Sequence, residues 1–353
     1  MHTDSSGQPR PLLSILIPTY NRAHYLRLSL YNWLDQINTA KEPVELIVSD
    51  NASTDNTREV VEEAHCLGSF KYNRNSVNLG FEKNAQKLLN IARGEFVWIL
   101  GDDDIPLQGA VDRVLDVIKD KSIPTDYIFV NYRWGNLDAS KLIKSNEIDW
   151  VEKKVAVDDF EDKYMVSSEI VPILGLLPCA IRSNVWRREK AIKAFSVDFN
   201  KTDKMTFFAT QMSFFMRNAL HEFCYYIGRP CTYGGIEVAW GKYMPLYNLE
   251  VVPSVFDLFE EKGVDPESIK KCRRAHFYLI QSLIVPWFFR KYPGQTKSFR
   301  WIICNRLWKL FRWSVFWFFI KALMLSADRQ IGKAGLLLKK HNPKIYNQIK
   351  RKK

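Results

Sequence analysis

The stretch FVWILGDDD, residues 96–104, places three consecutive carboxylates directly after an apolar run. A short apolar run is typical of a buried strand, so Asp102, Asp103 and Asp104 are expected at the carboxyl end of one. Adjacent aspartates repel one another unless a cation or hydrogen-bond donors compensate. A divalent metal bridging a diphosphate would compensate, because Mg²⁺ sites commonly combine one or two carboxylates with waters and phosphates. The alternative is a solvated, acidic helix N-terminus before Ile105-Pro106, favoured by the helix dipole.

Two earlier segments, LLSILIP (residues 12–18) and VELIVSD (residues 44–50), repeat the pattern of an apolar run followed by a turn. Between them, residues 24–36 carry leucines and a tryptophan at helical spacing. Residues 58–64 and 82–92 are also typical of helices. Strands that alternate with helices predict an α/β fold built on a doubly wound, mostly parallel, Rossmann-like sheet.

The expected ligand site of such a sheet is the crevice beyond the carboxyl ends of its strands. Residues 18–22, 50–56 and 102–104 would all lie at that edge. The sequence therefore predicts that the acidic triplet shares one site with the turns that follow the first two strands.

The remaining segments carry weaker signals. Residues 70–72 and 126–130 predict two further strands, and residues 136–163 are polar enough for a loop-rich insertion. Residues 173–181 predict a strand and a bend, and residues 207–220 carry a helical apolar stripe.

The composition is that of a folded chain. With 353 residues and 46% hydrophobic composition, it can bury a sizeable core. The six cysteines show no CxxC spacing, which argues against a zinc knuckle or a disulfide framework and favours reduced thiols in a cytosolic setting. The polar N-terminal residues 1–11 have no apolar core of a signal peptide, so secretion is not expected.

Charge divides the chain unevenly. Residues 270–353 hold 21 Lys and Arg against one acidic residue, whereas residues 1–269 have a net charge of −8. Residues 299–325 combine basic side chains with dense aromatics, which predicts a basic amphipathic helix lying in a membrane interface. An anionic membrane surface is therefore the expected partner of this segment and the basic tail. No nucleic acid is expected, because the aromatics form one block instead of alternating with base-reading polar groups.

Several motifs occur in a fixed order before and around the acidic triplet. They are SILIPTYNR (residues 14–22), ELIVSDNASTD (residues 45–55), NLG (residues 78–80), ARGEF (residues 92–96) and DDD (residues 102–104). Together they resemble glycosyltransferase family 2, a family with the GT-A fold. The resemblance covers roughly residues 12–130, and four motifs in the right order at the right separations, with ARGEF and DDD counted as one, make it specific.

The resemblance implies a role for each matched position. Asp50 would hydrogen-bond the base of a nucleotide, and Asp102 would contact the ribose or diphosphate. The metal would lie on Asp103, with Asp104 as the alternative ligand, because Gly101 stands where the family more often has an acidic residue. The full set implied to bind the nucleotide sugar is Pro18, Thr19, Tyr20, Arg22, Asp50, Asn78, Gly80, Asn84 and Asp102.

The catalytic base is less clear. Inverting members of the family use a carboxylate that removes the proton of the acceptor hydroxyl. The position that best matches the spacing of that base is Gln211, ahead of Arg217, and a glutamine cannot act as a base. Asp198 and Asp203 are the nearby carboxylates, and Asp203 is favoured. Inverting and retaining chemistry both stay open.

The expected organisation is a polar tail (residues 1–11), a nucleotide-sugar-binding GT-A half (residues 12–135), an acceptor-binding and catalytic half (residues 136–270) and a basic helical region that associates with membranes (residues 271–353). The resemblance implies transfer of one sugar from a nucleotide diphosphate donor, with UDP favoured, and a divalent metal, Mn²⁺ or Mg²⁺. The QxxRW motif of processive synthases is absent, which favours a single transfer.

The expected acceptor is a glycan or a glycolipid, lipid-linked or part of a surface polysaccharide. The expected location is the cytoplasmic side of the cell, peripheral on the inner face of the membrane. Two alternatives stay open. One is a homologue that binds the donor without catalysis, and the other is a sugar nucleotidyltransferase. The second would need a glycine-rich, basic triphosphate loop, which residues 18–22 do not supply.

Overall fold

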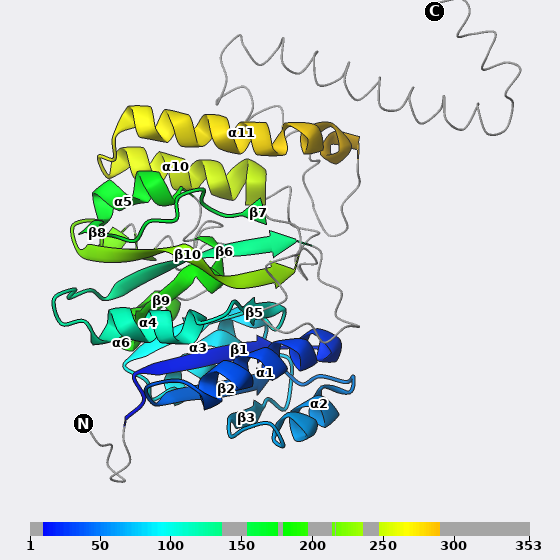
Figure 1. Ribbon diagram of the computed structural model, residues 1–353. Coiled ribbons are helices and arrows are strands. Elements are labelled where there is room, and N and C mark those ends of the chain that lie inside the picture. The colour runs from blue at the N-terminus through cyan, green and yellow to red at the C-terminus, as the bar shows by residue number, and fades with distance from the viewer. Residues whose placement is uncertain are drawn as a thin grey trace, which may run out of the picture. The chain divides into compact units, whose positions relative to one another are not determined.

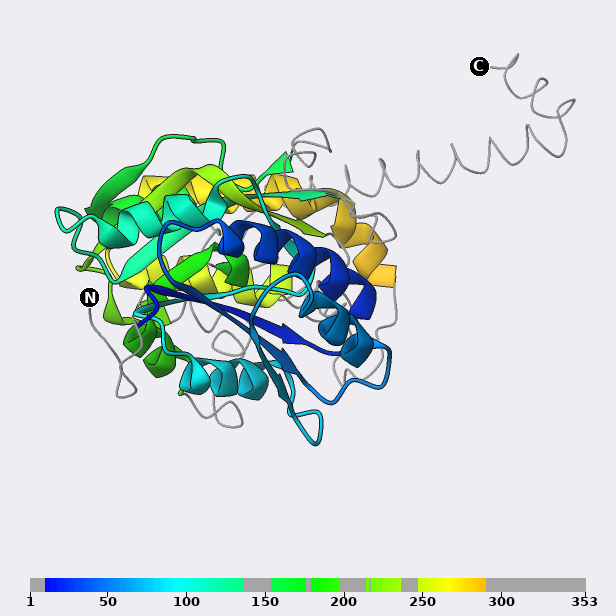
Figure 2. The same ribbon diagram turned by 60° about the horizontal axis from the view of Figure 1, so that its bottom comes forward.

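Figures 1 and 2 show the computed structural model. The chain comprises two compact units. The first comprises residues 1–239 with 254–269, and the second comprises residues 240–253 with 270–353. Within them the structure describes residues 10–135, 154–175, 179–196, 214–215, 217–235 and 247–289.

The first unit is built on a sheet with the strand order β3-β2-β1-β4-β9-β6-β10-β5 among the described residues. The first four strands along the chain are β1 (Leu13–Thr19), β2 (Val44–Asp50), β3 (Lys71–Arg74) and β4 (Phe96–Ile99). They pair in parallel, β3 with β2, β2 with β1 and β1 with β4. The α/β fold expected from the sequence, with its parallel strands, is confirmed.

Helices connect these strands and cover both faces of the sheet. The connecting helices are α1 (Ala23–Asn38), α2 (Thr57–Ala64) and α3 (Phe81–Ile91), and a further helix, α4 (Ala110–Lys119), follows later in the chain. Figure 2 shows dark blue α1 on one side of the blue strands and cyan α3 on the other. This arrangement is the doubly wound pattern, because helices cover both faces of the parallel strands.

Burial of apolar side chains explains why these segments fold as they do. Every residue of β1 is buried, as a strand covered on both faces must be. On α1, Leu26, Leu30 and Trp33 recur at helical spacing and are fully buried against the sheet. The indole of Trp33 meets the edge of Trp98 on β4 with the ring centroids 5.3 Å apart. This contact fixes α1 over the strand that leads to the acidic triplet.

The later strands make the sheet mixed. They are β5 (Asp104–Pro106), β6 (Tyr127–Gly135), β7 (Lys154–Val155), β8 (Lys163–Val166), β9 (Asn184–Arg187) and β10 (Phe223–Gly235). β10 runs parallel to β6, while β9 lies antiparallel between β4 and β6. β5 is antiparallel to β10, so the end of β10 lies beside the start of β5.

The prediction of a strand and bend over residues 173–181 is wrong. The described part contains the end of α5 (Ser167–Leu174) and the start of a 3₁₀ turn, η3 (Ile181–Ser183). The apolar run of this segment does not alternate with polar residues. Its pattern therefore does not distinguish a short strand from a turn of buried helix. α6 (Arg188–Phe195) then follows β9.

The second unit is described by residues 247–253 and 270–289. Its chain includes a π-helical turn, η5 (Tyr247–Val251), in which the carbonyl of Asn248 lies 3.0 Å from Nε2 of the buried His276. Two helices, α10 (Val252–Glu261) and α11 (Pro266–Phe289), have residues in both units. Among the helices that the structure describes, none combines the length and apolar character needed to span a bilayer. The predicted interfacial segment, residues 299–325, lies outside the described residues.

Candidate active site

The carboxyl ends of β1, β2 and β4 bring the predicted donor-binding residues to one edge of the sheet. Thr19 at the end of β1 is in register with Asp50 at the end of β2. The acidic triplet follows β4, which pairs with the other side of β1. The structure therefore places the turns after all three strands together, as the sequence predicted.

Arg22 and Thr19 hold the first two carboxylates of the triplet. The guanidinium of Arg22 bridges them, with Nε 2.7 Å from Asp102 Oδ1 and Nη2 2.9 Å from Asp103 Oδ2. The hydroxyl of Thr19 donates to Asp102 Oδ2 at 2.8 Å. The Arg22 guanidinium also lies 4.3 Å above the ring centre of Tyr25. Asp102 is thus fixed from two sides, and both carboxylates face a cation.

Asp104 turns the other way, into the protein. Its Oδ2 accepts a hydrogen bond from the backbone N–H of Gly101 at 2.6 Å, which closes the turn. Its Oδ1 lies 2.6 Å from Nη1 of Arg182. Its carbonyl accepts hydrogen bonds from Ser29 Oγ and Trp33 Nε1 on α1. The alternative of a solvated helix N-terminus is wrong, because Asp104 is fully buried and begins a strand.

The electrostatics of the turn favour additional positive charge. Burial raises the pKa of Asp102 to about 6, although Arg22 opposes the shift. Burial also raises the pKa of Asp104, against the opposing effect of Arg182. For Arg22, burial acts to lower the pKa, but the carboxylates Asp102 and Asp103 outweigh it, so the pKa lies above its ordinary value. A further cation beside these carboxylates would favour their ionised forms.

The acidic turn suits a hard divalent cation. Asp103 offers carboxylate oxygens, the ligands that Mg²⁺ and Mn²⁺ prefer. Glycines pack against it on both sides, where a side chain would crowd the carboxylate. A Cβ at Gly101 would approach Asp103 Oδ1 to 2.7 Å, and one at Gly235 would approach Oδ2 to 3.1 Å. Within the described residues, no group of three or more His, Cys, Asp or Glu side chains is arranged to hold a metal. The fit is therefore to a cation bound by few carboxylates and completed by waters and phosphates.

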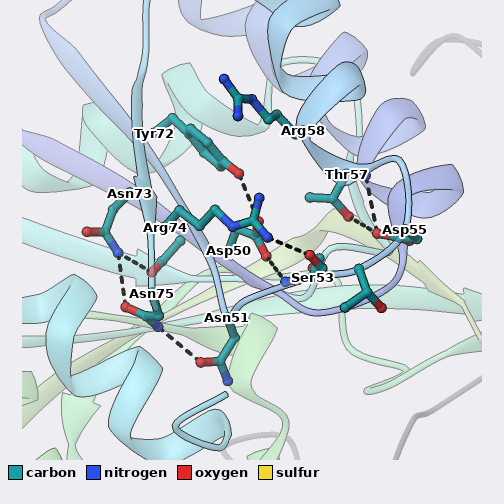
Figure 3. Close-up of polar contacts among 12 residues, drawn as sticks. Asp50, Asn51, Ser53, Asp55, Thr57, Arg58, Tyr72, Asn73, Arg74 and Asn75 are labelled. Carbon is teal, nitrogen blue, oxygen red and sulfur yellow. Dashed lines mark hydrogen bonds and ion pairs between the residues drawn. The ribbon is translucent and has the colours of Figure 1, made fainter. Parts of the chain in front are cut away.

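Asp50 is the centre of a second polar cluster (Figure 3). Its Oδ1 accepts a hydrogen bond from the backbone N–H of Ser53 at 2.7 Å, and its Oδ2 accepts one from Tyr72 Oη at 2.8 Å. Arg74 has its Nε 3.5 Å from the same Oδ2 and donates through Nη2 to the carbonyl of Ser53 at 2.7 Å. Burial and the bond to Asp50 raise the pKa of Tyr72. Asp50 thus fixes the turn after β2, and its predicted contact with a nucleotide base stays a prediction.

A hydrogen-bonded cluster of asparagines lies beside the turn after β2. Asn51 donates through Nδ2 to Asn78 Oδ1 at 2.8 Å, and its own Oδ1 accepts hydrogen bonds from Asn75 Nδ2 and the N–H of Leu79. Asn84 on α3 is buried, donates to the carbonyl of Ser49 and accepts from the Ser49 hydroxyl at 2.7 Å. The role of Asn84 in this structure is therefore to join α3 to β2. Asn78 lies in this cluster of asparagines, and its predicted contact with the nucleotide sugar stays a prediction.

The turns after β1 and β2 are locked together by a strained residue. Asn21 has a φ of 53°, in the left-handed region that non-glycine residues seldom adopt. Its Oδ1 accepts from the N–H of Thr54 at 2.7 Å, and its own N–H donates to Ser53 Oγ at 2.9 Å. Tyr20, next to it, is 43% exposed, so its ring is accessible at this edge.

Asp55 in the motif of residues 45–55 and the catalytic candidates complete the positions taken from the sequence. Asp55 forms hydrogen bonds to Thr57 at the start of α2 and to the N–H of Ala23, which gives it a capping and bracing role. The catalytic candidates Asp198 and Asp203, and Gln211 as well, lie outside the described residues. The position of Arg182 beside the acidic turn has no signal in the sequence, because an isolated arginine carries no local pattern of burial.

Comparison with known proteins agrees with this architecture. The family model for glycosyl transferase family 2 matches residues 14–223. Abequosyltransferase RfbV of Salmonella typhimurium is 41% identical over 95 residues, which are 26% of this chain and 28% of that protein. A GalNAc(5)-diNAcBac-PP-undecaprenol beta-1,3-glucosyltransferase of Campylobacter jejuni is 35% identical over 107 residues, 30% of this chain and 34% of its own. The matched segments thus span only about a third of these relatives.

Solved structures support the fold. The crystal structure of S. aureus TarS 1–349 in complex with UDP-GlcNAc has a TM-score of 0.54 at 17% identity, covering 84% of this chain and 80% of that one. A second crystal structure of S. aureus TarS 1–349 has a TM-score of 0.52 at 16% identity, covering 84% of this chain and 79% of that one. With the family model matching more than half of its residues, the chain belongs to glycosyl transferase family 2.

Proposed function

We propose that this protein transfers a single sugar from a nucleotide diphosphate donor, with UDP favoured, to a lipid-linked or surface-polysaccharide acceptor with the help of a divalent metal. The observation that carries the proposal is the acidic turn. It presents Asp102 and Asp103 beside Arg22 at the edge where the buried Asp50 ends the neighbouring strand β2. A cation and a diphosphate would complete the charge balance of this turn.

The residues of the chain suggest how the donor would be held. Asp103 would bind Mn²⁺ or Mg²⁺, with Asp104 as the second candidate from the sequence. The metal, when bound, would offset the negative charge that builds on the leaving diphosphate. Arg22, whose side chain is 18% exposed, would place a guanidinium beside that diphosphate. Tyr20 offers an exposed ring at the same edge for packing against the nucleotide.

The acceptor side rests on sequence and on the relatives. In an inverting transfer the acceptor hydroxyl loses its proton to a carboxylate, and Asp203, with Asp198 as the second candidate, would serve as that base. The Campylobacter jejuni relative is named for an undecaprenol-linked acceptor, which supports a lipid-linked acceptor here. The basic tail and residues 299–325 support a peripheral position on the inner face of the membrane.

The experiment that tests the proposal is calorimetric titration of UDP, CDP, GDP and dTDP, first with Mn²⁺ and then with EDTA. Metal-dependent binding of one diphosphate, lost in Asp103→Asn, would support it. Asp116→Asn is the matched control, because that carboxylate is 63% exposed on α4. Absence of binding by every nucleotide tested would overturn the proposal.

A donor-binding homologue without catalysis is the second candidate, because the expected base position falls on Gln211. Donor hydrolysis distinguishes the two. A catalytic protein that binds UDP-sugar releases UDP slowly when water replaces the acceptor, whereas a binding protein releases none. Measurement of UDP release with the wild type and with Asp203→Asn therefore separates the candidates and tests the proposed base.

A further inference from the structure

Arg182 forms a buried ion pair with the last carboxylate of the acidic turn. Its Nη1 lies 2.6 Å from Asp104 Oδ1, and the exposed fractions of the two side chains are 15% and 1%. Neither atom has a hydrogen-bond partner among the described residues, so the ion pair is what compensates both charges. Breaking such a pair on one side leaves a buried charge without compensation.

The protein provides a slot for this arginine. A Cβ at Gly234 on β10 would lie 0.9 Å from Arg182 Nη1, so any larger residue there would occupy the place of the guanidinium. The ring of Tyr132 on β6 has its centre 5.3 Å from the guanidinium carbon. The carbonyl of Arg182 accepts a hydrogen bond from Trp98 Nε1 at 2.7 Å. Three strands thus position Arg182. Trp98 on β4 holds its backbone carbonyl, Tyr132 on β6 offers a ring to its guanidinium, and Gly234 on β10 leaves the space for it.

The carboxylates of Asp104 and its neighbour Asp103 have different contacts. One oxygen of Asp104 closes the turn through Gly101 and the other faces Arg182, so both oxygens are engaged inside the protein. Asp103 instead pairs with Arg22, whose side chain reaches the surface of the site. Gly101 and Gly235 lie against the Asp103 carboxylate, and a Cβ at either position would crowd its oxygens.

We propose that Arg182 is a positioning residue that holds Asp104 inward as an internal counter-ion, so that the turn presents Asp103 alone as the carboxylate ligand of a divalent cation. The proposal rests on the donor and metal site proposed above. It gives the second half of the chain a direct part in shaping that site, since Arg182 lies in η3 and its space depends on Gly234.

The first test needs neither metal nor donor. Thermal unfolding in EDTA is measured for Arg182→Met, Asp104→Asn and the double variant. Each single change is expected to lower Tm, and the double variant to recover part of the loss, because removing both partners leaves no unpaired buried charge. The exposed pair Arg27–Glu63, 2.6 Å apart, is the control, and Arg27→Met with Glu63→Gln should show no measurable coupling. Additive effects of Arg182→Met and Asp104→Asn would overturn the proposal.

The second test measures UDP affinity in Mn²⁺ by calorimetry. Asp104→Asn should keep metal-dependent binding that Asp103→Asn loses. Arg182→Met should weaken it by about 10- to 100-fold, the usual loss when a supporting partner of a metal site is removed. Adding Asp104→Asn to Arg182→Met should restore affinity toward that of Asp104→Asn alone. If Arg182→Met does not fold, the UDP affinities of the double variant and of Arg182→Lys are compared with that of Asp104→Asn instead.

The outcomes separate this inference from the proposed function. Loss of binding in Asp104→Asn equal to that in Asp103→Asn would make Asp104 a metal ligand and overturn the inference while leaving the donor site intact. No binding of any nucleoside diphosphate by the wild type would instead overturn the proposed function. The unfolding cycle would then still decide whether Arg182 and Asp104 act as a pair.

Discussion

Glu45 is a buried carboxylate at the start of β2, at the end of the sheet away from the acidic turn. The hydroxyl of Ser14 and the backbone N–H of Arg93 donate to its Oε2 at 2.7 and 2.9 Å. Lys71 Nζ and Arg93 Nε each lie 3.1 Å from its Oε1. Burial acts to raise the pKa of Glu45, but these donors outweigh it, so the pKa lies below its ordinary value.

This shift gives a pH-dependent prediction. A carboxylate whose pKa is lower in the folded state stabilises the fold above its unfolded pKa and loses that effect as pH falls through the folded pKa. We expect Glu45→Gln to lower the free energy of unfolding by about 2 kcal/mol at pH 7. The difference in free energy of unfolding between Glu45→Gln and the wild type should shrink as the pH falls below 4.5, the ordinary pKa of a glutamate. Denaturant unfolding at several pH values checks it, with the exposed Glu62→Gln as control. A difference that grows on acidification would contradict the assignment.

Arg22 leads to a prediction about cation binding. In this structure it bridges Asp102 and Asp103, so a divalent cation at Asp103 must compete with its guanidinium. Arg22→Met should therefore lower Tm in EDTA, because two buried carboxylates lose their counter-ion. Added Mn²⁺ should raise the Tm of Arg22→Met more than that of the wild type, since ligand binding to the folded state stabilises it. Equal Mn²⁺ shifts in the two proteins, with Arg27→Met as control, would show that Arg22 does not oppose the cation.

At the scale of elements, the connection from α3 to β4 depends on one glycine. A Cβ at Gly94 would lie 2.5 Å from the backbone nitrogen of Ser14 on β1 and 2.7 Å from the carbonyl of Phe96. Backbone atoms cannot move aside without disturbing the pairing of β1 with β4, so Gly94→Ala should destabilise the protein by about 3 kcal/mol.

The control for this change is Gly68→Ala. There the nearest atom to an added Cβ is the side-chain Oδ1 of Asn38, 2.8 Å away, and that side chain can turn aside. Chemical denaturation of both variants measures the difference in unfolding free energy. Equal losses in Gly94→Ala and Gly68→Ala would mean that the close approach of Gly94 to β1 does not limit the packing.

The elements of the first half could be predicted because each carries its own local signal. β1 and β2 are almost completely buried, which a continuous apolar run reveals. α1 and α3 bury one stripe each, which the helical spacing of leucines reveals. The carboxyl ends of parallel strands meet at one edge, so predicting β1, β2 and β4 also predicted where Thr19, Asp50 and Asp102 lie together.

The second half could not be predicted to the same extent, because its structure depends on contacts between distant residues. β5 has three residues and β9 has four, and each is defined by its pairing with strands far along the chain. The burial of Asp104 follows from Arg182 and Gly101, which no local pattern around the triplet indicates. The sequence therefore located the acidic turn but left the separate roles of its three carboxylates open.

At the scale of the whole molecule, charge divides the chain into two parts of opposite sign. Residues 1–269 have a net charge of −8 and include the proposed nucleotide site, where Arg22 and Arg182 balance buried carboxylates. Residues 270–353 have a net charge of +20. A diphosphate donor is attracted by particular cations in the site, whereas an anionic surface is attracted by the summed charge of the tail. Donor binding by residues 1–269 and membrane binding by residues 270–353 can therefore be tested separately.

The full chain should sediment with vesicles that contain anionic lipid, bind weakly to neutral vesicles and lose binding as salt rises. Replacing the four basic residues 350–353 by glutamine should weaken that binding, since each basic residue near an anionic leaflet contributes roughly 1 kcal/mol. The matched control changes the net charge equally at exposed basic residues of the first unit, Arg27, Lys41, Arg58 and Lys119. If the control weakened binding as much as the change at 350–353, the attraction would belong to the net charge of the molecule and not to its tail. Equal binding to neutral and anionic vesicles would remove the electrostatic basis of the proposed membrane position.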